Sequence, residues 1–217
     1  MSHKLITIVG MGNGISSGVA NRFAQDGFKI GMIARNLDAL KYYRSGFEGL
    51  RIDSYIAQAD AGNEKELISA IDSIHKQSGV TSTVLLYNAA ILQRANILEQ
   101  NYDDIVNSFK VNVAGAIVAV RAVLPGMRTH GGSILLTGGG FSMFPNPDYG
   151  ALSLGKAGIK NLTQSLATAL KGTQVKVGSV TVCGYVSQND PKYNPTSIAD
   201  EFWKIHQSEP SGTDVIY

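Results

Sequence analysis

Short runs of consecutive apolar residues alternate along the chain with longer segments whose apolar residues recur every three or four positions. The apolar runs predict strands at residues 5–9, 29–34, 51–57, 83–87, 133–137 and 175–182, and a last short strand at 214–217. The periodic segments predict helices at 16–26, 64–77, 102–127 and 149–171, and a shorter helix at 37–44. Strands that are apolar on both faces are typical of a parallel sheet covered by helices.

This repeated alternation predicts an α/β protein with a doubly wound parallel sheet, the three-layer α/β/α arrangement of the Rossmann fold. No stretch rich in Pro, Gly or Ser divides the chain, and no repeat recurs at a fixed period. Residues 1–217 are therefore expected to form a single nucleotide-binding domain. Residues 188–196, which contain several Asn, Asp and Pro, are predicted to be an exposed loop with freedom to move.

Composition narrows the classes of partner. The 19 basic and 17 acidic residues give a net charge of +2 and are scattered, so no basic stripe is present and nucleic acid is not an expected partner. The first apolar segment is too short for a signal-peptide core, and the apolar run 113–120 is too short to span a membrane. Cys183 is the single cysteine, which excludes an internal disulfide and a cysteine-based metal cluster. We expect a cytoplasmic protein with a small-molecule substrate, no membrane partner and no metal.

A glycine-rich turn follows the first predicted strand. The chain there reads Gly10-Met-Gly12-Asn13-Gly14-Ile15, and an apolar-periodic helix comes directly after it. Glycines let the backbone bend sharply and let a pyrophosphate approach the amides, while the helix N-terminus adds partial positive charge. A tight turn without a ligand would use the same residues, but the position between strand and helix favours a dinucleotide site.

The second predicted strand ends at Arg35. An NAD-specific site usually places Asp or Glu there for the ribose 2′-hydroxyl, and this chain has no acid at that position. A guanidinium can instead pair with a 2′-phosphate, so NADP is favoured over NAD, which stays an alternative. The competing interpretation is a solvated arginine at a strand exit.

With these motifs the chain resembles the short-chain dehydrogenase/reductase family over nearly its whole length. Asp60 matches the family's adenine-contacting acid, and Asn88-Ala89 match its Asn-Asn-Ala-Gly signature after the fourth strand. Asn112 matches the active-site Asn that bends the long helix and holds a water of the proton relay. Lys156 matches the Lys that hydrogen-bonds the nicotinamide ribose. The resemblance implies a bound NAD(P)(H), oxidoreductase activity, and homodimers or homotetramers built on the long helices.

The catalytic segment departs from the family pattern. The family places a Tyr four residues before the Lys and a Ser thirteen residues before that Tyr, and these positions are Leu152 and Gly139 here. Tyr149 lies seven residues before Lys156, and this spacing resembles the Tyr-x6-Lys pattern of the enoyl-acyl-carrier-protein reductases. Seven helical residues turn through about 700°, about 20° short of two turns, so both side chains would share one face. Tyr149 is therefore the predicted proton donor, with Lys156 and Asn112 in support; the alternative is an aromatic residue at the helix entrance.

The sequence thus favours an NADPH-preferring reductase of a small or medium-sized carbonyl compound. Two alternatives stay open. One is an enoyl reductase that acts on a carbon–carbon double bond. The other is a non-catalytic nucleotide-binding regulator that has lost the usual Ser and Tyr.

Overall fold

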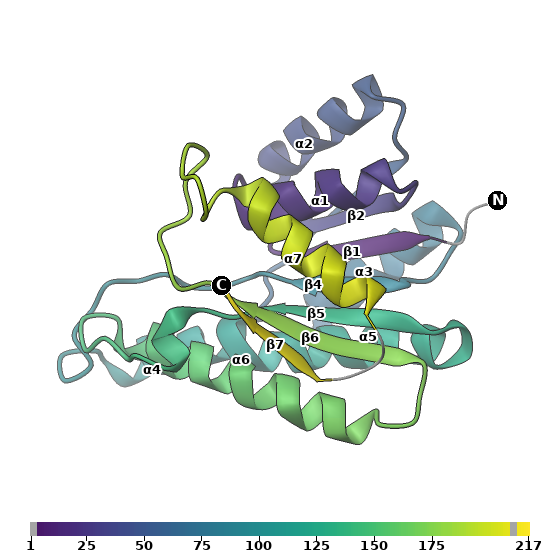
Figure 1. The fold of residues 1–217 in the computed structure, drawn as a ribbon. Coiled ribbons are helices and arrows are strands. Elements are labelled where there is room, and N and C mark those ends of the chain that lie inside the picture. The colour runs from purple at the N-terminus through teal and green to yellow at the C-terminus, as the bar shows by residue number, and fades with distance from the viewer. Residues whose placement is uncertain (1–3, 209–211) are drawn as a thin grey trace.

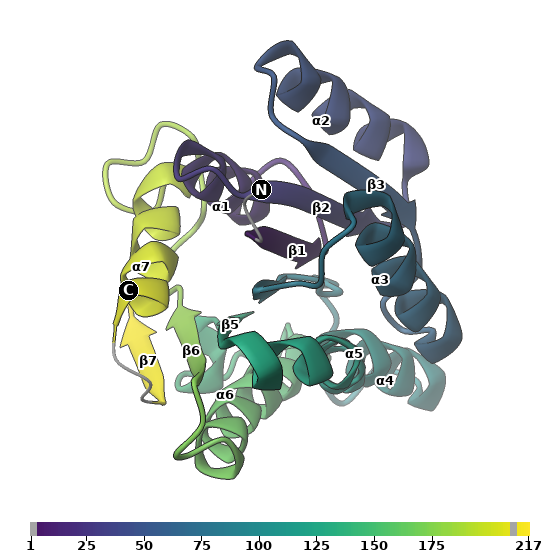
Figure 2. The same ribbon diagram turned by 90° about the vertical axis from the view of Figure 1, so that its right-hand side faces the viewer.

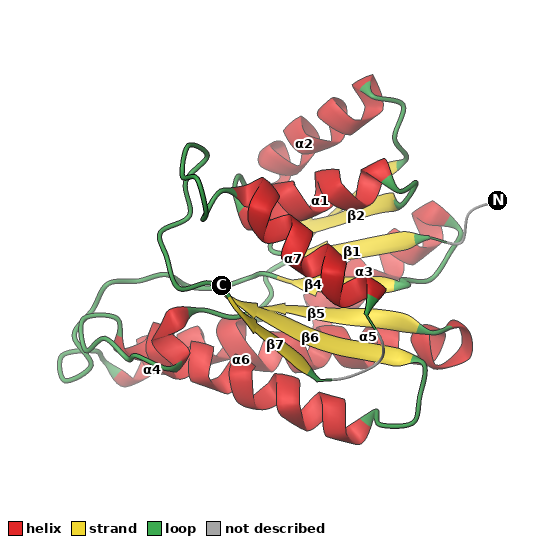
Figure 3. Ribbon diagram, viewed as in Figure 1, coloured by secondary structure: helices red, strands yellow, loops and turns green. Residues whose placement is uncertain are grey.

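The computed structural model describes residues 4–208 and 212–217 and contains one seven-stranded parallel sheet in the order β3-β2-β1-β4-β5-β6-β7 (Figures 1 and 3). Its strands are β1 Leu5–Val9, β2 Lys29–Ala34, β3 Ser54–Gln58, β4 Val84–Tyr87, β5 Gly132–Thr137, β6 Val175–Thr181 and β7 Thr213–Ile216. The chain adds strands outward from β1 in one direction and then returns to add β4 on its other side. The predicted doubly wound α/β fold is confirmed.

Helices cover both faces of the sheet (Figure 2). One face carries α1 Ile15–Gln25, α2 Leu37–Gly49 and α7 Pro195–Gln207. The other carries α3 Glu64–Ser78, α4 Tyr102–Phe109, α5 Gly115–His130 and α6 Gly150–Ala169. Successive strand residues point to opposite faces, so Leu5 and Val9 join one apolar cluster while Ile6 and Ile8 join the other. This explains why the strands are apolar throughout.

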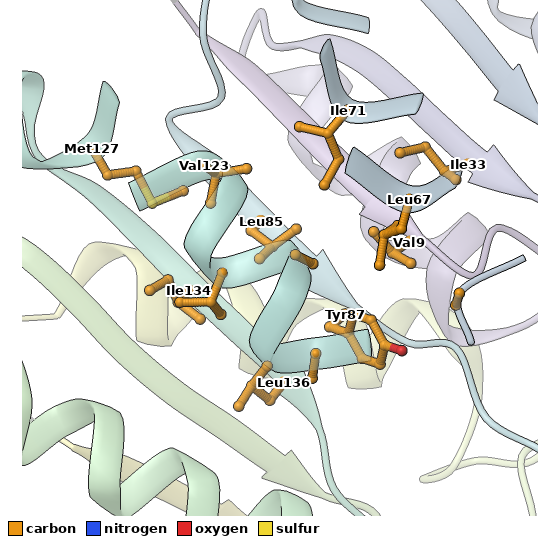
Figure 4. Packing of buried hydrophobic residues seen from close by; sticks show 14 of the residues in the cluster. Val9, Ile33, Leu67, Ile71, Leu85, Tyr87, Val123, Met127, Ile134 and Leu136 are labelled. Carbon is orange, nitrogen blue, oxygen red and sulfur yellow. The ribbon is translucent and has the colours of Figure 1, made fainter. Parts of the chain in front are cut away.

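The cluster beneath α3 and α5 is drawn in Figure 4. Leu67 of α3 and Val123 of α5 pack with strand side chains such as Leu85 and Ile134, and all four are at most 1% exposed. Burying one such side chain contributes about 1.5 to 3 kcal/mol. The two helices are therefore fixed against the strands whose carboxyl ends carry the site.

The predicted long helix is interrupted. A π-helical turn, Lys110–Ala114, separates α4 from α5, at the place where the family resemblance expected a bend at Asn112. Within the described residues, one helical run is long and apolar enough to cross a membrane by length and composition: Tyr102–His130, with a mean hydropathy of 1.4. Ala116, Val120 and Met127 of this run lie in the core against the sheet, so packing accounts for part of its apolar character.

The helix predicted at 37–44 is confirmed but extends to Gly49. The loop predicted at 188–196 ends at Asn194, and α7, which was not predicted, follows it. The signals for α7 are in the sequence: the Asn194 side chain accepts a hydrogen bond from the Ser197 amide, and Pro195 occupies the first turn. The remaining loop is held by Asp190, whose carboxylate accepts the amides of Lys192 and Tyr193.

Candidate functional site

A cavity of about 1190 Å³ opens at the carboxyl ends of the strands, where the strand order reverses between β1 and β4. Arg35, Asp38 and Asp60 line its β2–β3 side. Its β4–β6 side includes Asn88 and Lys156. All the cofactor residues predicted from sequence line this cavity except Gly12: Gly10, Asn13, Gly14, Ile15, Arg35, Asp60, Asn88, Ala89 and Lys156. The structure therefore brings together residues that are up to 146 positions apart (156 − 10).

Gly10 fixes the floor of the cavity. Its backbone has a φ of 89°, and a Cβ there would lie 2.4 Å from the amide nitrogen of Ala89. Asn88 holds the same junction, because its Nδ2 donates to the Gly10 carbonyl over 3.1 Å. The turn after β1 and the end of β4 therefore meet as closely as two backbones can, which only glycine permits here.

The start of α1 differs from the starts of the other capped helices. A side-chain oxygen accepts a first-turn amide in α2, α3, α4 and α7, and each time the capping residue is an asparagine: Asn36, Asn63, Asn101 and Asn194. In α1 the corresponding residue, just before the helix, is Gly14, which has no side chain to accept an amide; it lines the cavity, and an added Cβ would meet nothing within 4 Å. Packing within the chain does not require glycine at this position, whereas close approach of an anionic ligand to the helix amides does.

The β2–β3 side of the cavity carries an unpaired cation. Arg35 is exposed, and its guanidinium forms no ion pair with any residue that the structure describes. The nearby acids are engaged: Asp60 accepts the Gly62 amide over 2.8 Å, and Asp38 pairs with Lys41 over 3.2 Å. Arg35 is thus available to an anionic group in the cavity.

On the β4–β6 side, Lys156 reaches from α6 to the end of β5. Its Nζ donates to the Thr137 carbonyl over 2.9 Å, and the Thr137 hydroxyl donates to Asn88 Oδ1 over 2.9 Å. A Cβ on Gly139 would lie 3.2 Å from the Lys156 Cδ and Cε, so the lysine stem lies against this glycine. Burial lowers the pKa of Lys156 to about 8, because the charged ammonium is poorly solvated there.

Asn112 lies behind the cavity and not in its lining. It is buried in the π-helical turn, where its Oδ1 accepts the Ile91 amide over 2.7 Å and its Nδ2 donates to the Ser108 hydroxyl over 3.0 Å. Ile91 does line the cavity. Asn112 therefore positions the segment after β4, and a direct role in proton transfer stays a prediction.

Tyr149 does not line the cavity. It is the residue before the first turn of α6, with φ −132° and ψ 44°, so the helical spacing that related it to Lys156 does not apply to it. Its ring stacks on Phe141 with centroids 5.4 Å apart, and its hydroxyl has no hydrogen-bond partner among the described residues. Leu152, at the family's Tyr position, is buried. The structure thus brings Lys156, but not Tyr149, into the cavity wall.

Sequence reasoning missed Thr137, which links Asn88 to Lys156. Its signal was only its position at the last residue of a buried strand, where a polar residue faces the carboxyl edge of the sheet. The partners of its hydroxyl and carbonyl come from distant segments and could not be identified from spacing.

Comparison with known proteins places the chain in a family. The family model described as short chain dehydrogenase matches residues 4–196. Carbonyl reductase family member 4 of Danio rerio is 26% identical over 179 residues, which cover 82% of this chain and 73% of that protein. The 3-oxoacyl-[acyl-carrier-protein] reductase of Rattus norvegicus is 26% identical over 191 residues, covering 88% and 78%.

Solved structures share the fold. A short chain dehydrogenase from Burkholderia cenocepacia in complex with NADP has a TM-score of 0.87 and 22% identity, covering 99% of this chain and 96% of that one. The L-sorbose reductase of Gluconobacter frateurii, complexed with NADPH and L-sorbose, has a TM-score of 0.88 and 19% identity, covering 100% and 95%. Because the family model spans most of the sequence, the chain belongs to the short-chain dehydrogenase family.

Proposed function

We propose that the protein is an NADPH-preferring oxidoreductase that reduces a small or medium-sized carbonyl compound and accepts NADH more weakly. The observation that carries this proposal is the cavity itself, in which the uncapped start of α1 lies between Arg35 and Lys156. The pyrophosphate and the 2′-phosphate of NADPH are negatively charged, and the start of α1 and Arg35 are suited to bind these two groups. Relatives named as carbonyl reductase and 3-oxoacyl-[acyl-carrier-protein] reductase support the substrate class.

The residues present fit NADPH. The open backbone at Gly14 and the α1 amides would hold the pyrophosphate, Arg35 the 2′-phosphate, and Lys156 the nicotinamide ribose. Asp60 would contact the adenine, as the family resemblance implies. When bound, the reduced nicotinamide supplies a hydride to the substrate carbon. Asn112 accepts the Ile91 amide and so keeps Ile91 in place in the cavity lining.

Replacing Arg35 with alanine is expected to weaken NADPH binding about 10- to 150-fold, because charge-assisted hydrogen bonds contribute about 1.5 to 3 kcal/mol. Affinity for NADH should stay unchanged, since NADH has no 2′-phosphate. Calorimetric titration with both cofactors measures the effect. Arg44→Ala is the matched control, because Arg44 pairs with Glu48 on α2 and does not line the cavity. Unchanged NADPH affinity in Arg35→Ala would exclude the assignment.

Two alternative functions rest on specific residues. The Tyr149–Lys156 spacing in the sequence resembles that of the enoyl reductases, although Tyr149 lies outside the cavity lining, and Gly139 with Leu152 at the usual Ser and Tyr positions favours a regulator that binds NADPH without turnover. Screening aldehydes, ketones and enoyl thioesters for NADPH oxidation separates the three functions. Turnover of enoyl thioesters alone would replace our proposal with the first alternative, and tight binding without any oxidation would replace it with the second.

Self-association is part of this proposal. Small residues of the long helices are packed inside the chain: an added Cβ at Gly115 would meet Ala61 and Tyr87, and one at Gly158 would meet Val113. Instead, apolar side chains lie exposed on neighbouring helices of one face: Phe109 (52%) on α4, Ile117 (40%) on α5 and Leu154 (54%) on α6. We expect a dimer or tetramer by light scattering at micromolar concentration, and a monomer for Phe109→Glu combined with Leu154→Glu. A monomeric unmodified protein would contradict this expectation.

A further inference from the structure

The β4–β6 side of the cavity contains a single titratable side chain among the residues that the structure describes. The other residues that line this side come from the segment after β4, the ends of β5 and β6 and the π-helical turn, and their side chains are apolar, amide or hydroxyl groups or, at glycine, absent. The other titratable lining residues, Arg35, Asp38 and Asp60, follow β2 and β3 on the far side of β1. A reaction on the β4–β6 side that needs a proton from the protein therefore meets Lys156 first.

The other nearby hydroxyl and thiol groups either lie outside the cavity lining or already donate their proton within the chain. Tyr149 stacks on Phe141 outside its lining, and the Ser142 hydroxyl is buried without a partner, also outside the lining. Cys183 is exposed and directs its Sγ to the Thr181 carbonyl. The Thr137 hydroxyl does belong to the lining, but it already donates its proton to Asn88.

The amine of Lys156 is held in place and still has protons to give. An ammonium group has three N–H donors, and the hydrogen bond to the Thr137 carbonyl uses one. None of the ion pairs among the described residues involves Lys156, so no carboxylate neutralises it. Because Gly139 has no side chain, the lysine stem lies flat against the end of β5, where a serine Cβ would press on it at 3.2 Å.

We propose that the Lys156 ammonium is itself the proton donor of the reaction, in place of a phenol. This inference rests on the proposed function. In the reduction, the carbonyl carbon gains the hydride that the reduced cofactor supplies, the C=O π bond opens, and the oxygen takes a proton as one Lys156 N–H bond breaks. The substrate gains two electrons, the cofactor is oxidised by two electrons, and the neutral amine regains its proton from water.

The acidity of the group agrees with this role. A general acid works best when its pKa lies near the working pH, and burial brings the pKa of Lys156 to about 8. An unperturbed phenol titrates near 10 and would need a neighbouring cation to donate easily near neutrality. The donor form of Lys156 is the protonated one, so the rate of reduction must fall as the pH rises past about 8.

The experiment compares Lys156→Arg, Lys156→Met and Tyr149→Phe with the unmodified protein, each bound to NADPH. Turnover of a responsive carbonyl compound is followed between pH 6 and 10. In parallel, the Lys156 amine is titrated by NMR on protein with ¹³C-labelled lysine, assigned by the signal missing in Lys156→Arg. Arginine keeps a positive charge and hydrogen-bond donors for the ribose, but its pKa is too high for proton transfer. Methionine removes the charge from a buried site and is expected to fold.

A donor Lys156 predicts an amine pKa between about 7 and 9 in the NADPH complex. It predicts a tenfold fall in rate per pH unit above that pKa in both the unmodified protein and Tyr149→Phe. In Lys156→Arg the rate should drop about 100-fold or more and lose this break, with NADPH affinity reduced less than tenfold. The proposal is overturned if the amine titrates above 10, if Lys156→Arg keeps the break, or if Tyr149→Phe removes turnover. Calorimetry with NADPH tests the proposed function separately. If the unmodified protein binds NADPH tightly and turns over a carbonyl compound, the proposed function is supported even when one of these three results excludes Lys156 as the donor.

Discussion

Replacing Gly14 with aspartate is expected to weaken NADPH binding at least about 100-fold while leaving the protein as stable as before. An Asp at the capping position, just before the first residue of a helix, accepts a first-turn amide, as the asparagines before α2, α3, α4 and α7 do. In α1 that carboxylate would occupy and repel the proposed place of the pyrophosphate. The new Cβ meets nothing within 4 Å, so the unfolding free energy should change by no more than about 0.5 kcal/mol.

Calorimetry with NADPH and urea unfolding measure the two halves of this prediction. Gly12→Asp is the matched control, since it adds the same charge two residues away, at a glycine that has an open Cβ position and does not line the cavity. It should weaken NADPH binding by less than about tenfold, because its carboxylate lies outside the cavity lining and does not occupy the proposed place of the pyrophosphate. Equal losses in both variants would mean that charge alone, and not the start of α1, controls binding.

Gly10→Ala is expected to lower the unfolding free energy by about 2 to 5 kcal/mol and to weaken NADPH binding as well. The substitution combines two costs. A left-handed backbone costs a non-glycine residue about 1 to 2 kcal/mol, and overpacking costs about 1 to 3 kcal/mol. The φ of 89° brings the first, and a Cβ 2.4 Å from the Ala89 nitrogen brings the second.

Gly27→Ala separates these two costs. Gly27 has a φ of 77°, but a Cβ there would meet nothing within 4 Å, so only the backbone cost of about 1 to 2 kcal/mol applies. Urea unfolding of both variants gives the difference between the two changes. If Gly10→Ala lowers the unfolding free energy no more than Gly27→Ala does, the close contact between the turn after β1 and the end of β4 does not stabilise the site.

Local patterns predicted the sheet, its two-sided cover of helices and a set of cofactor residues of which all but Gly12 line the cavity, because each depends on signals within a few residues. The apolar runs at β1 and β4 and the glycine turn are of this kind. Gly12 is the one predicted cofactor residue that does not line the cavity. Its amide donates a hydrogen bond to the Ser16 hydroxyl instead. Periodicity can identify a turn, but it does not determine which of its glycines faces the ligand.

The catalytic segment could not be predicted in the same way. The pairing of Tyr149 with Lys156 assumed that both residues belong to one helix, whereas α6 begins at Gly150. The contacts that orient each side chain join distant segments: Tyr149 meets Phe141, and Lys156 meets Thr137. Such tertiary contacts leave no periodic trace in the sequence, so the spacing alone could not show which group faces the cavity.

We propose that this cavity binds NADPH and that the protein uses it to reduce a carbonyl compound. The most direct measurement is the loss of NADPH absorbance in the presence of a panel of aldehydes and ketones, with product analysis and with Gly14→Asp as the inactive control. We expect at least one of these compounds to oxidise NADPH with formation of an equal amount of alcohol, and Gly14→Asp to abolish the reaction. NADPH that binds but is not oxidised by any of them, or oxidation that continues unchanged in Gly14→Asp, would contradict this proposal.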